Sequence, residues 1–165
     1  KDVSAQLSAD KLIRASTLAY EFVQKVSKKS PSPLGLIGLN PHAGGNGSIG
    51  TEESTVYEPV RRELDARKIP FVGPLVPDVA FIKDNWKKFS FYISPYHDQA
   101  LIPFKLIHGK SSGAHVTLGL PFVRTSVDHG TAKDIFNKNK ADPGSMIDAL
   151  KWALQLSAPS SKEKR

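Results

Sequence analysis

Three stretches of this sequence gather side chains that could do chemistry. The first is Asn40–Gly47 (NPHAGGNG), in which His42 stands ahead of several glycines. The second is Tyr96–Gln99 (YHDQ), and the third extends from Lys105 to Thr131. Short apolar runs typical of strands precede these stretches. Because ligands of parallel sheets bind outside the carboxyl ends of the strands, all three are candidate binding loops.

The two histidines of the first two loops could bind a divalent cation. His42 and His97 would each supply an imidazole nitrogen, and Asp98 could be a further ligand or orient His97. A zinc-type site usually has three protein ligands plus water, but no third ligand stands in a comparable loop. His108 and His129 qualify by residue type alone. The plainer alternatives are an exposed imidazole in a turn for His42 and a hydrogen-bonded structural histidine for His97.

The third stretch carries the cations that could hold an anion. Lys105 and Arg124 could bind a phosphate or carboxylate through charge-assisted hydrogen bonds, and ordinary surface cations are the alternative. Gly130 and Thr131, ahead of a predicted short helix, could point backbone N–H groups at an anion. The serine, aspartate and histidine within residues 126–129 are too close together for a hydrolase triad, and no nucleophile-elbow, Walker or G-x-G-x-x-G motif is present.

The elements that must position these loops alternate between strands and helices. Apolar spacing predicts a long helix capped by Ser8, and a helix over 52–68 in which Pro59 causes a kink or a late start. Asp142 and Pro143 are expected to open a last helix that extends to Leu156. The other predicted elements are strands at 34–39, 71–74, 90–94 and 114–120 and a short helix at 131–136. This order predicts an α/β layered domain with a mostly parallel sheet.

Composition limits the function classes. The 165 residues include no cysteine, which excludes a disulfide scaffold, a thiolate metal site and a cysteine nucleophile. No apolar run reaches the length of a membrane span and no signal region is visible, so a cytoplasmic protein without a membrane partner is expected. The net charge of +7 comes partly from the chain ends and otherwise from dispersed cations, so no nucleic-acid partner is expected, although a polyanion binder is one alternative.

An ordered set of motifs carries a resemblance to a known family. LNPHAG, GP-x-x-PD, YHDQ, LGLPF-x-RTSVDHGTA and KADPGS occur in this order between residue 1 and about residue 156. They resemble the 4-hydroxythreonine-4-phosphate dehydrogenase family of pyridoxal 5'-phosphate biosynthesis. The resemblance implies an isocitrate/isopropylmalate-dehydrogenase-like α/β fold, truncated on its N-terminal side. It also implies NAD-dependent oxidation, with decarboxylation, of a small phosphorylated hydroxy amino acid, 4-phosphohydroxy-L-threonine.

The resemblance also implies roles for particular residues. His42 and His97 would be metal ligands for Zn, Mg or Co, and Lys105 and Arg124 would contact the substrate. His115 stands where the family has a substrate-binding asparagine, and Gly45 where the family favours glutamate. The cofactor NAD would meet the segment of Asp128, His129, Gly130 and Thr131. No general acid or base is assigned.

The family enzymes are about twice as long as this chain, and their third metal histidine lies just upstream of the matching segment. Residues 1–157 are therefore interpreted as the C-terminal half of a dehydrogenase and residues 158–165 as a polar tail. A homodimer that shares the metal site between subunits is expected. Two further hypotheses remain open: a related dehydrogenase of a phosphorylated threonate-type acid, and a non-catalytic binding or dimerisation module made of this half alone.

Overall fold

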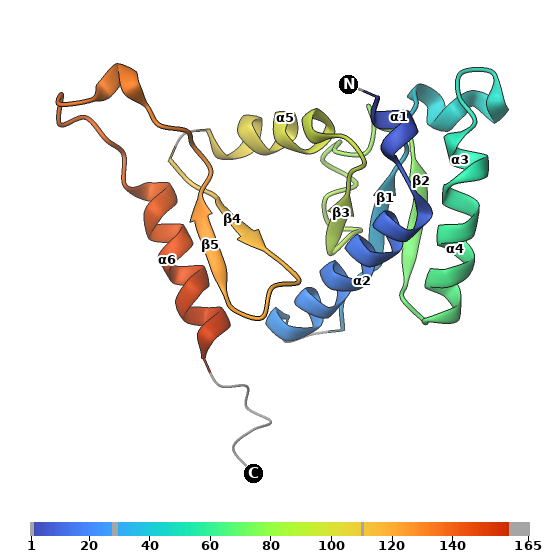
Figure 1. Ribbon diagram of the computed structural model, residues 1–165, viewed down its shortest axis with the longest axis horizontal. Coiled ribbons are helices and arrows are strands. Elements are labelled where there is room, and N and C mark those ends of the chain that lie inside the picture. The colour runs from blue at the N-terminus through green and yellow to red at the C-terminus, as the bar shows by residue number, and fades with distance from the viewer. Residues whose placement is uncertain (1, 28–29, 110, 159–165) are drawn as a thin grey trace, which may run out of the picture. The chain divides into compact units, whose positions relative to one another are not determined.

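A computed structural model describes residues 2–27, 30–109 and 111–158 (Figure 1). The chain divides into two compact units, Lys1–Pro103 and Phe104–Arg165. The predicted tail at 158–165 lies, apart from Ala158, outside the described residues. No helix in the described part of the chain is long and apolar enough to cross a membrane.

The first unit is built on a three-stranded parallel sheet, which confirms the predicted sheet type. Its strands are β1 (Leu34–Ile37), β2 (Phe71–Leu75) and β3 (Phe91–Ile93), in the order β2-β1-β3. Leu34 pairs with Phe71 on one side and with Phe91 on the other, so β1 is the central strand. All four residues of β1 are buried, as expected of a parallel strand that is covered on both faces.

Two helices, α2 (Ala9–Val26) and α4 (Tyr57–Ala66), cover one face of this sheet. Helix α2 packs against β3 and against α4, and Figure 1 shows α2 crossing in front of β1. Leu34 and Leu36 point to that face because side chains alternate along a strand. They join a core cluster that also contains Leu12, Ala19, Tyr57, Val60, Leu64, Ile69 and Ile93.

The connection between β2 and β3 lies against the other face of the sheet. A Cβ built on Gly35 would come within 3.0 to 3.2 Å of Leu75, Tyr92 and Phe89, so a larger residue there would have to push these side chains apart. Tyr92 is held in place by the ring of Phe81, 4.6 Å away between centroids, and its hydroxyl donates to the Ala80 carbonyl at 3.0 Å. Both faces of β1 are therefore packed.

The predicted helix signals act as expected, with small shifts of the boundaries. The Ser8 hydroxyl accepts a hydrogen bond from the Lys11 N–H at 3.4 Å and caps α2, which follows a short helix α1 (Val3–Gln6). The helix predicted over 52–68 is split at Val56 into α3 (Glu52–Thr55) and α4. Pro59 lies in the first turn of α4, so the late start is confirmed.

The second unit contains an antiparallel strand pair covered by one helix. Strands β4 (Ala114–Thr117) and β5 (Arg124–Val127) pair with each other, and α6 (Gly144–Ser157) packs on both. The strand predicted over 114–120 ends at Thr117, β5 was not predicted, and the pair is antiparallel because a short six-residue connection can only reverse the chain. The Gly144 N–H donates to Asp142 Oδ1 at 2.8 Å, but α6 begins at Gly144 with Pro143 at its capping position, one residue later than predicted.

Helix α5 (His97–His108) was also missed. Pro103 lies in its interior, where a proline removes a backbone donor and is normally a helix breaker. The segment before it contains the YHDQ motif, and the helix continues past Pro103 through Lys105. Two of the candidate loops are thus joined by one helix rather than by an irregular connection.

Candidate functional site

The first candidate loop follows β1 and has an unusual backbone. Residues 41–47 form a 3₁₀-type turn, η1 (Pro41–Gly47), in which φ is positive at six successive positions from His42 to Gly47. For a residue other than glycine this left-handed conformation costs roughly 1–2 kcal/mol. Ala43, with φ of 48°, carries that cost, and it is smaller for His42 and Asn46, with φ of 52° and 55°, because histidine and asparagine tolerate positive φ better. The loop therefore needs external contacts that hold it in this shape.

Those contacts come from α3. Glu53 Oε1 accepts from the Asn40 backbone N–H at 2.9 Å, and Glu53 Oε2 accepts from Asn40 Nδ2 at 2.8 Å. Glu52 Oε2 accepts from the same Nδ2 at 2.7 Å, and hydrogen bonds from the Ser4 hydroxyl first and from Asn40 second lower the pKa of Glu52. A Cβ on Gly44 would lie 2.7 Å from Glu53 Oε2, so a glycine is needed at this position. The result is an exposed His42 side chain on an anchored backbone.

The second candidate loop follows β3 and places His97 at the first residue of α5. Its Nδ1 lies 2.8 Å from Asp98 Oδ1, which leaves Nε2 as the nitrogen available to a ligand. Gln99 Nε2 donates to the Gly38 carbonyl at 2.9 Å and so fastens the first turn of α5 to the end of β1. Because β1 and β3 are parallel neighbours, His42 and His97 follow the same edge of the sheet.

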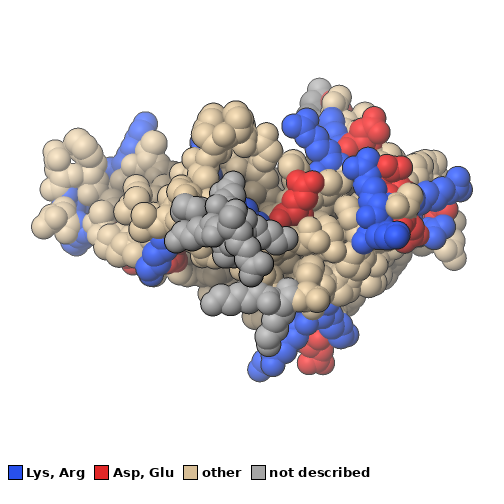
Figure 2. Space-filling view, turned by 90° about the horizontal axis from the view of Figure 1, so that it is seen from below, with Lys and Arg blue, Asp and Glu red and all other residues tan. Residues whose placement is uncertain are grey.

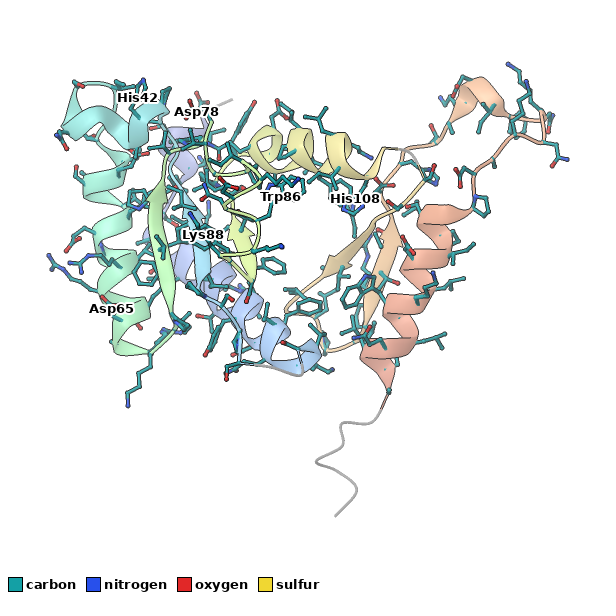
Figure 3. The ribbon with its side chains drawn as sticks, turned by 180° about the vertical axis from the view of Figure 1, so that it is seen from behind. His42, Asp65, Asp78, Trp86, Lys88 and His108 are labelled. Carbon is teal, nitrogen blue, oxygen red and sulfur yellow. The ribbon has the colours of Figure 1, made fainter. Side chains whose placement is uncertain are left out.

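A pocket of about 330 Å³ lies beside His42. The residues around it come from the segments that follow β1 and β2 and from the first turn of α5. They are Leu39, Pro41, His42, Pro77, Asp78 and Gln99. Figure 3 shows His42 and Asp78 at the same end of the sheet. Sequence reasoning noted the GP-x-x-PD segment but gave Asp78 no role, because only the fold brings the ends of β1 and β2 together.

The donor chemistry of this edge fits part of a cation site. Two imidazoles and a carboxylate are ligands that a divalent metal accepts. Across residues 2–27, 30–109 and 111–158, however, no group of three or more His, Cys, Asp or Glu side chains is arranged to hold a metal ion. The described residues therefore offer ligands for an incomplete site. The prediction that His42 and His97 are metal ligands stays a prediction.

In the second unit, Lys105 is bound to the residue that follows β5. Its Nζ donates to Asp128 Oδ2 at 2.6 Å and to the Asp128 carbonyl at 2.8 Å. The Asp128 side chain is 1% exposed and that of Lys105 is 43% exposed. Burial raises the pKa of Asp128, but hydrogen bonds from Lys105 and Ser145 outweigh burial and leave this pKa below its usual value.

The two other predicted substrate residues share one face of the β4–β5 pair. His115 is opposite Ser126 and Thr117 is opposite Arg124, and residues directly opposite or two apart point to the same side. Arg124 Nη1 donates to Thr117 Oγ1 at 2.7 Å, and both His115 and Arg124 are exposed. An exposed guanidinium and imidazole on one face can meet an anionic ligand.

The predicted cofactor segment is exposed after Asp128. His129, Gly130 and Thr131 are exposed, and His129 Nδ1 lies 2.9 Å from the Gly130 carbonyl. The helix expected at 131–136 is only the three-residue turn η2 (Lys133–Ile135). A single turn has no appreciable macrodipole, so the anion site expected at its N-terminus is not formed by helix geometry. The cofactor assignment itself stays a prediction.

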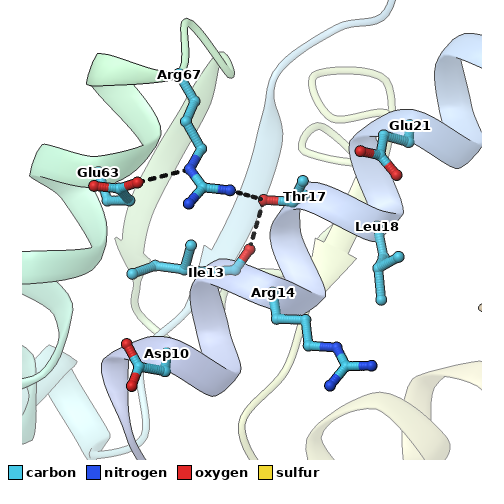
Figure 4. A pocket seen from close by; sticks show the side chains of 8 residues that line it. All are labelled: Asp10, Ile13, Arg14, Thr17, Leu18, Glu21, Glu63 and Arg67. Carbon is cyan, nitrogen blue, oxygen red and sulfur yellow. Dashed lines mark hydrogen bonds and ion pairs between the residues drawn. The ribbon is translucent and has the colours of Figure 1, made fainter. Parts of the chain in front are cut away.

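A larger pocket, of about 520 Å³, lies between α2 and α4 and contains none of the predicted residues (Figure 4). Arg67 lies in this pocket, donating to Glu63 Oε1 at 2.8 Å and to Thr17 Oγ1 at 3.4 Å.

On the face shown in Figure 2, Lys and Arg side chains are interspersed with Asp and Glu. On α4, for example, Arg61 and Arg62 both bind Glu58. These cations are partly balanced by neighbouring acids.

Comparisons with known proteins agree with the motifs. A family model described as pyridoxal phosphate biosynthetic protein PdxA matches residues 1–153. The 4-hydroxythreonine-4-phosphate dehydrogenase of Sulfurihydrogenibium sp. is 43% identical over 157 residues, which is 94% of this chain and 48% of that protein. The chain thus spans about half the length of the curated relatives it matches.

Solved structures give the same result. A 4-hydroxythreonine-4-phosphate dehydrogenase from Klebsiella pneumoniae matches with a TM-score of 0.80 and 34% identity, covering 93% of this chain and 46% of that one. A terephthalate 1,2-cis-dihydrodioldehydrogenase from Burkholderia xenovorans matches with a TM-score of 0.71 and 30% identity, covering 93% of this chain and 48% of that one. The fold is therefore one that dehydrogenases use.

Among proteins with this dehydrogenase fold, the family of the chain can be stated. The chain belongs to the pyridoxal phosphate biosynthetic protein PdxA family, because the family model covers nearly all of it. The family resemblance inferred from the motifs is confirmed.

Proposed function

We propose that this chain carries part of the active site of a 4-hydroxythreonine-4-phosphate dehydrogenase that uses NAD and a divalent metal ion. The observation that carries the proposal is the family match over residues 1–153, which includes the two histidine loops that follow neighbouring strands β1 and β3. Relatives named for this activity are 42–44% identical to the chain, but the chain spans less than half of each of them. The activity is therefore proposed for the complete protein.

In this proposal the substrate is 4-phosphohydroxy-L-threonine. Its hydroxyl-bearing carbon would give up a hydride, for which NAD⁺ would be the acceptor, and its hydroxyl would lose a proton, so that the substrate would become a 3-oxo acid. The 3-oxo acid then loses carbon dioxide. His42 and His97 would hold the metal ion together with a ligand outside the described residues. The chemistry that such a cation would supply there is Lewis acidity at the hydroxyl oxygen.

The other residues bind and orient. Asp98 keeps Nδ1 of His97 occupied, so that Nε2 is the nitrogen presented at the sheet edge. Lys105 and Arg124 would bind the anionic groups of the substrate, and holding the reacting groups in one geometry can account for much of a rate enhancement. We further propose a homodimer that shares the metal site, and a cytoplasmic location consistent with a biosynthetic role.

The test is NADH formation followed by its absorbance, with 4-phosphohydroxy-L-threonine and NAD⁺ as reactants. Activity should disappear after chelation, return with Zn²⁺, Mg²⁺ or Co²⁺, and be abolished in His42→Ala. His108→Gln, a histidine outside the proposed site, should remain active. Near-normal turnover of His42→Ala without added metal would reject the metal assignment.

A second candidate is a dehydrogenase of a phosphorylated threonate-type acid. His115, exposed beside Arg124 on the β4–β5 face, is the observation that favours it, because it replaces the asparagine expected from the family resemblance. A solved relative named for a different substrate, with 30% identity, is consistent with such variation. Comparing kcat/KM for the two substrates separates these candidates. Metal binding by calorimetry without turnover of either substrate would favour a non-catalytic binding module.

A further inference from the structure

Asp128 is a buried carboxylate whose partners are all within the second unit. Its Oδ2 accepts from Lys105 Nζ at 2.6 Å, and its Oδ1 lies 2.9 Å from the Ser145 hydroxyl. With a side chain that is 1% exposed, Asp128 offers little surface to a ligand. Transferring a carboxylate out of water is costly unless it is paired and hydrogen-bonded, and both conditions are met here.

Ser145 fixes Asp128 from the opposite side. Its Oγ accepts from the Asp128 backbone N–H at 3.0 Å and lies 2.8 Å from the Gly113 carbonyl. A hydroxyl has a single proton, so at any moment Ser145 donates either to Gly113 or to Asp128. Ser145 is itself fully buried at the start of α6. The backbone and the carboxylate of Asp128 are thus tied through Ser145 to α6 and to Gly113, the residue before β4.

The number of N–H donors on Lys105 decides how many remain for a ligand. An ammonium group has three N–H donors. Two of them are directed at the Asp128 carbonyl and carboxylate, so one is left for another acceptor. The Lys105 side chain is 43% exposed, which keeps the ammonium within reach of a ligand. A lysine without such partners is a flexible point charge that can turn any of its donors in any direction.

We propose that Asp128 is a positioning residue, which holds the Lys105 ammonium so that a single N–H is presented to an anionic group of the substrate. The inference rests on the proposed function, in which Lys105 binds the substrate. It departs from the role that the family resemblance implies for Asp128, which is contact with NAD. The buried carboxylate, with one oxygen on Lys105 and the other on Ser145, is built to act through Lys105.

The first experiment measures the contact itself, independently of activity. Lysine-selective ¹H–¹⁵N NMR of the full chain should show a Lys105 ammonium signal with a scalar coupling across the hydrogen bond to the carboxylate carbon of Asp128. The coupling should be lost in Asp128→Asn and kept in Asp134→Asn, an exposed aspartate of η2. A Lys105 signal without this coupling in the wild-type chain would overturn the proposal.

The second experiment separates orientation from charge. In the complete enzyme, Asp128→Asn should lower kcat/KM for the phosphorylated substrate by about 10- to 100-fold, the range expected when a charge-assisted hydrogen bond is lost. Inhibition by inorganic phosphate, which needs the positive charge but not its orientation, should not weaken, because a negative charge has been removed. The KM for NAD should be unchanged. A raised KM for NAD with unchanged substrate kinetics would instead support the cofactor role and reject the positioning role.

A double-mutant cycle completes the test. If Asp128 acts through Lys105, then Asp128→Asn should have almost no further effect in a Lys105→Met background. Additive losses would overturn the proposal. If Lys105→Met leaves the substrate kinetics intact, the proposed substrate role of Lys105 fails, whereas the NMR coupling still decides whether Asp128 positions the lysine. Ser145→Ala, which removes the support of Asp128 together with the contact of Ser145 to the Gly113 carbonyl, should give a smaller loss of the same kind and serves if Asp128→Asn does not fold.

Discussion

The anchoring of the His42 loop by Glu53 gives the sharpest stability prediction. In Glu53→Ala the Asn40 backbone N–H loses its carboxylate acceptor, whereas Asn40 Nδ2 keeps Glu52 at 2.7 Å. The loss is therefore closer to one hydrogen bond than to two. A hydrogen bond to a charged group contributes about 1.5–3 kcal/mol, which corresponds to a change of roughly 10- to 100-fold in the opening equilibrium of the loop.

Amide hydrogen exchange measures this opening. The Ile49 N–H donates to the Gly44 carbonyl and the Ala43 N–H to the Asn40 carbonyl, both at 3.2 Å, so both report on the loop. Their exchange should accelerate by that factor in Glu53→Ala, with the strain of the left-handed residues favouring the open state. Glu52→Ala is the matched control, because within the loop it removes an acceptor only from the Asn40 side chain, and its other partner, the Ser4 hydroxyl, lies in α1. Equal acceleration in the two variants, or none in Glu53→Ala, would refute this account of the loop.

Three other predictions follow from single contacts. Tyr57→Phe should lower the free energy of unfolding by about 1–3 kcal/mol in urea titrations, because the Ile37 carbonyl at 2.5 Å loses its buried donor; an unchanged midpoint would contradict this. Folding lowers the pKa of Asp128, so the ionised carboxylate stabilises the folded state above about pH 4, the unfolded-state pKa. This stabilisation is lost as the pH falls through the folded-state pKa, and Asp128→Asn should flatten that acid dependence of the unfolding free energy. Asp98→Asn should weaken Zn²⁺ affinity by about 10-fold or more in calorimetry, because His97 loses the partner that orients its ring, and equal affinity would argue against that role.

Local patterns in the sequence were sufficient for several elements of the first unit. The apolar run that becomes β1, the Ser8 cap of α2 and the late start near Pro59 depend on residues close together in the chain, so propensity and capping rules predict them. Helix α5 was missed because Pro103 is a strong local signal against a helix. Its first turn is held by a contact from Gln99 to the end of β1, some sixty residues away, which no local pattern reveals.

Some residues of the candidate site could likewise be predicted from the sequence, whereas the contacts between them could not. Residue type and loop position were enough to single out His42, His97, Lys105 and Arg124. The pairing of Lys105 with Asp128 joins residues 23 positions apart through the fold of the second unit. The approach of Asp78 to the His42 pocket likewise depends on the β2-β1-β3 strand order. Such contacts require the tertiary structure, because they arise from strand order and helix packing.

The left-handed backbone of the His42 loop also limits which residues can occupy it over evolutionary time. Histidine, asparagine and aspartate are the non-glycine residues that tolerate positive φ best, whereas β-branched residues tolerate it poorly. If His42 binds the metal as proposed above, position 42, with φ of 52°, has to meet two separate requirements, one for an imidazole and one for a compatible backbone. An asparagine there would preserve the loop and remove the imidazole, whereas a valine would damage both. Sequence variation at this position can thus distinguish a lineage that lost the chemistry from one that lost the fold.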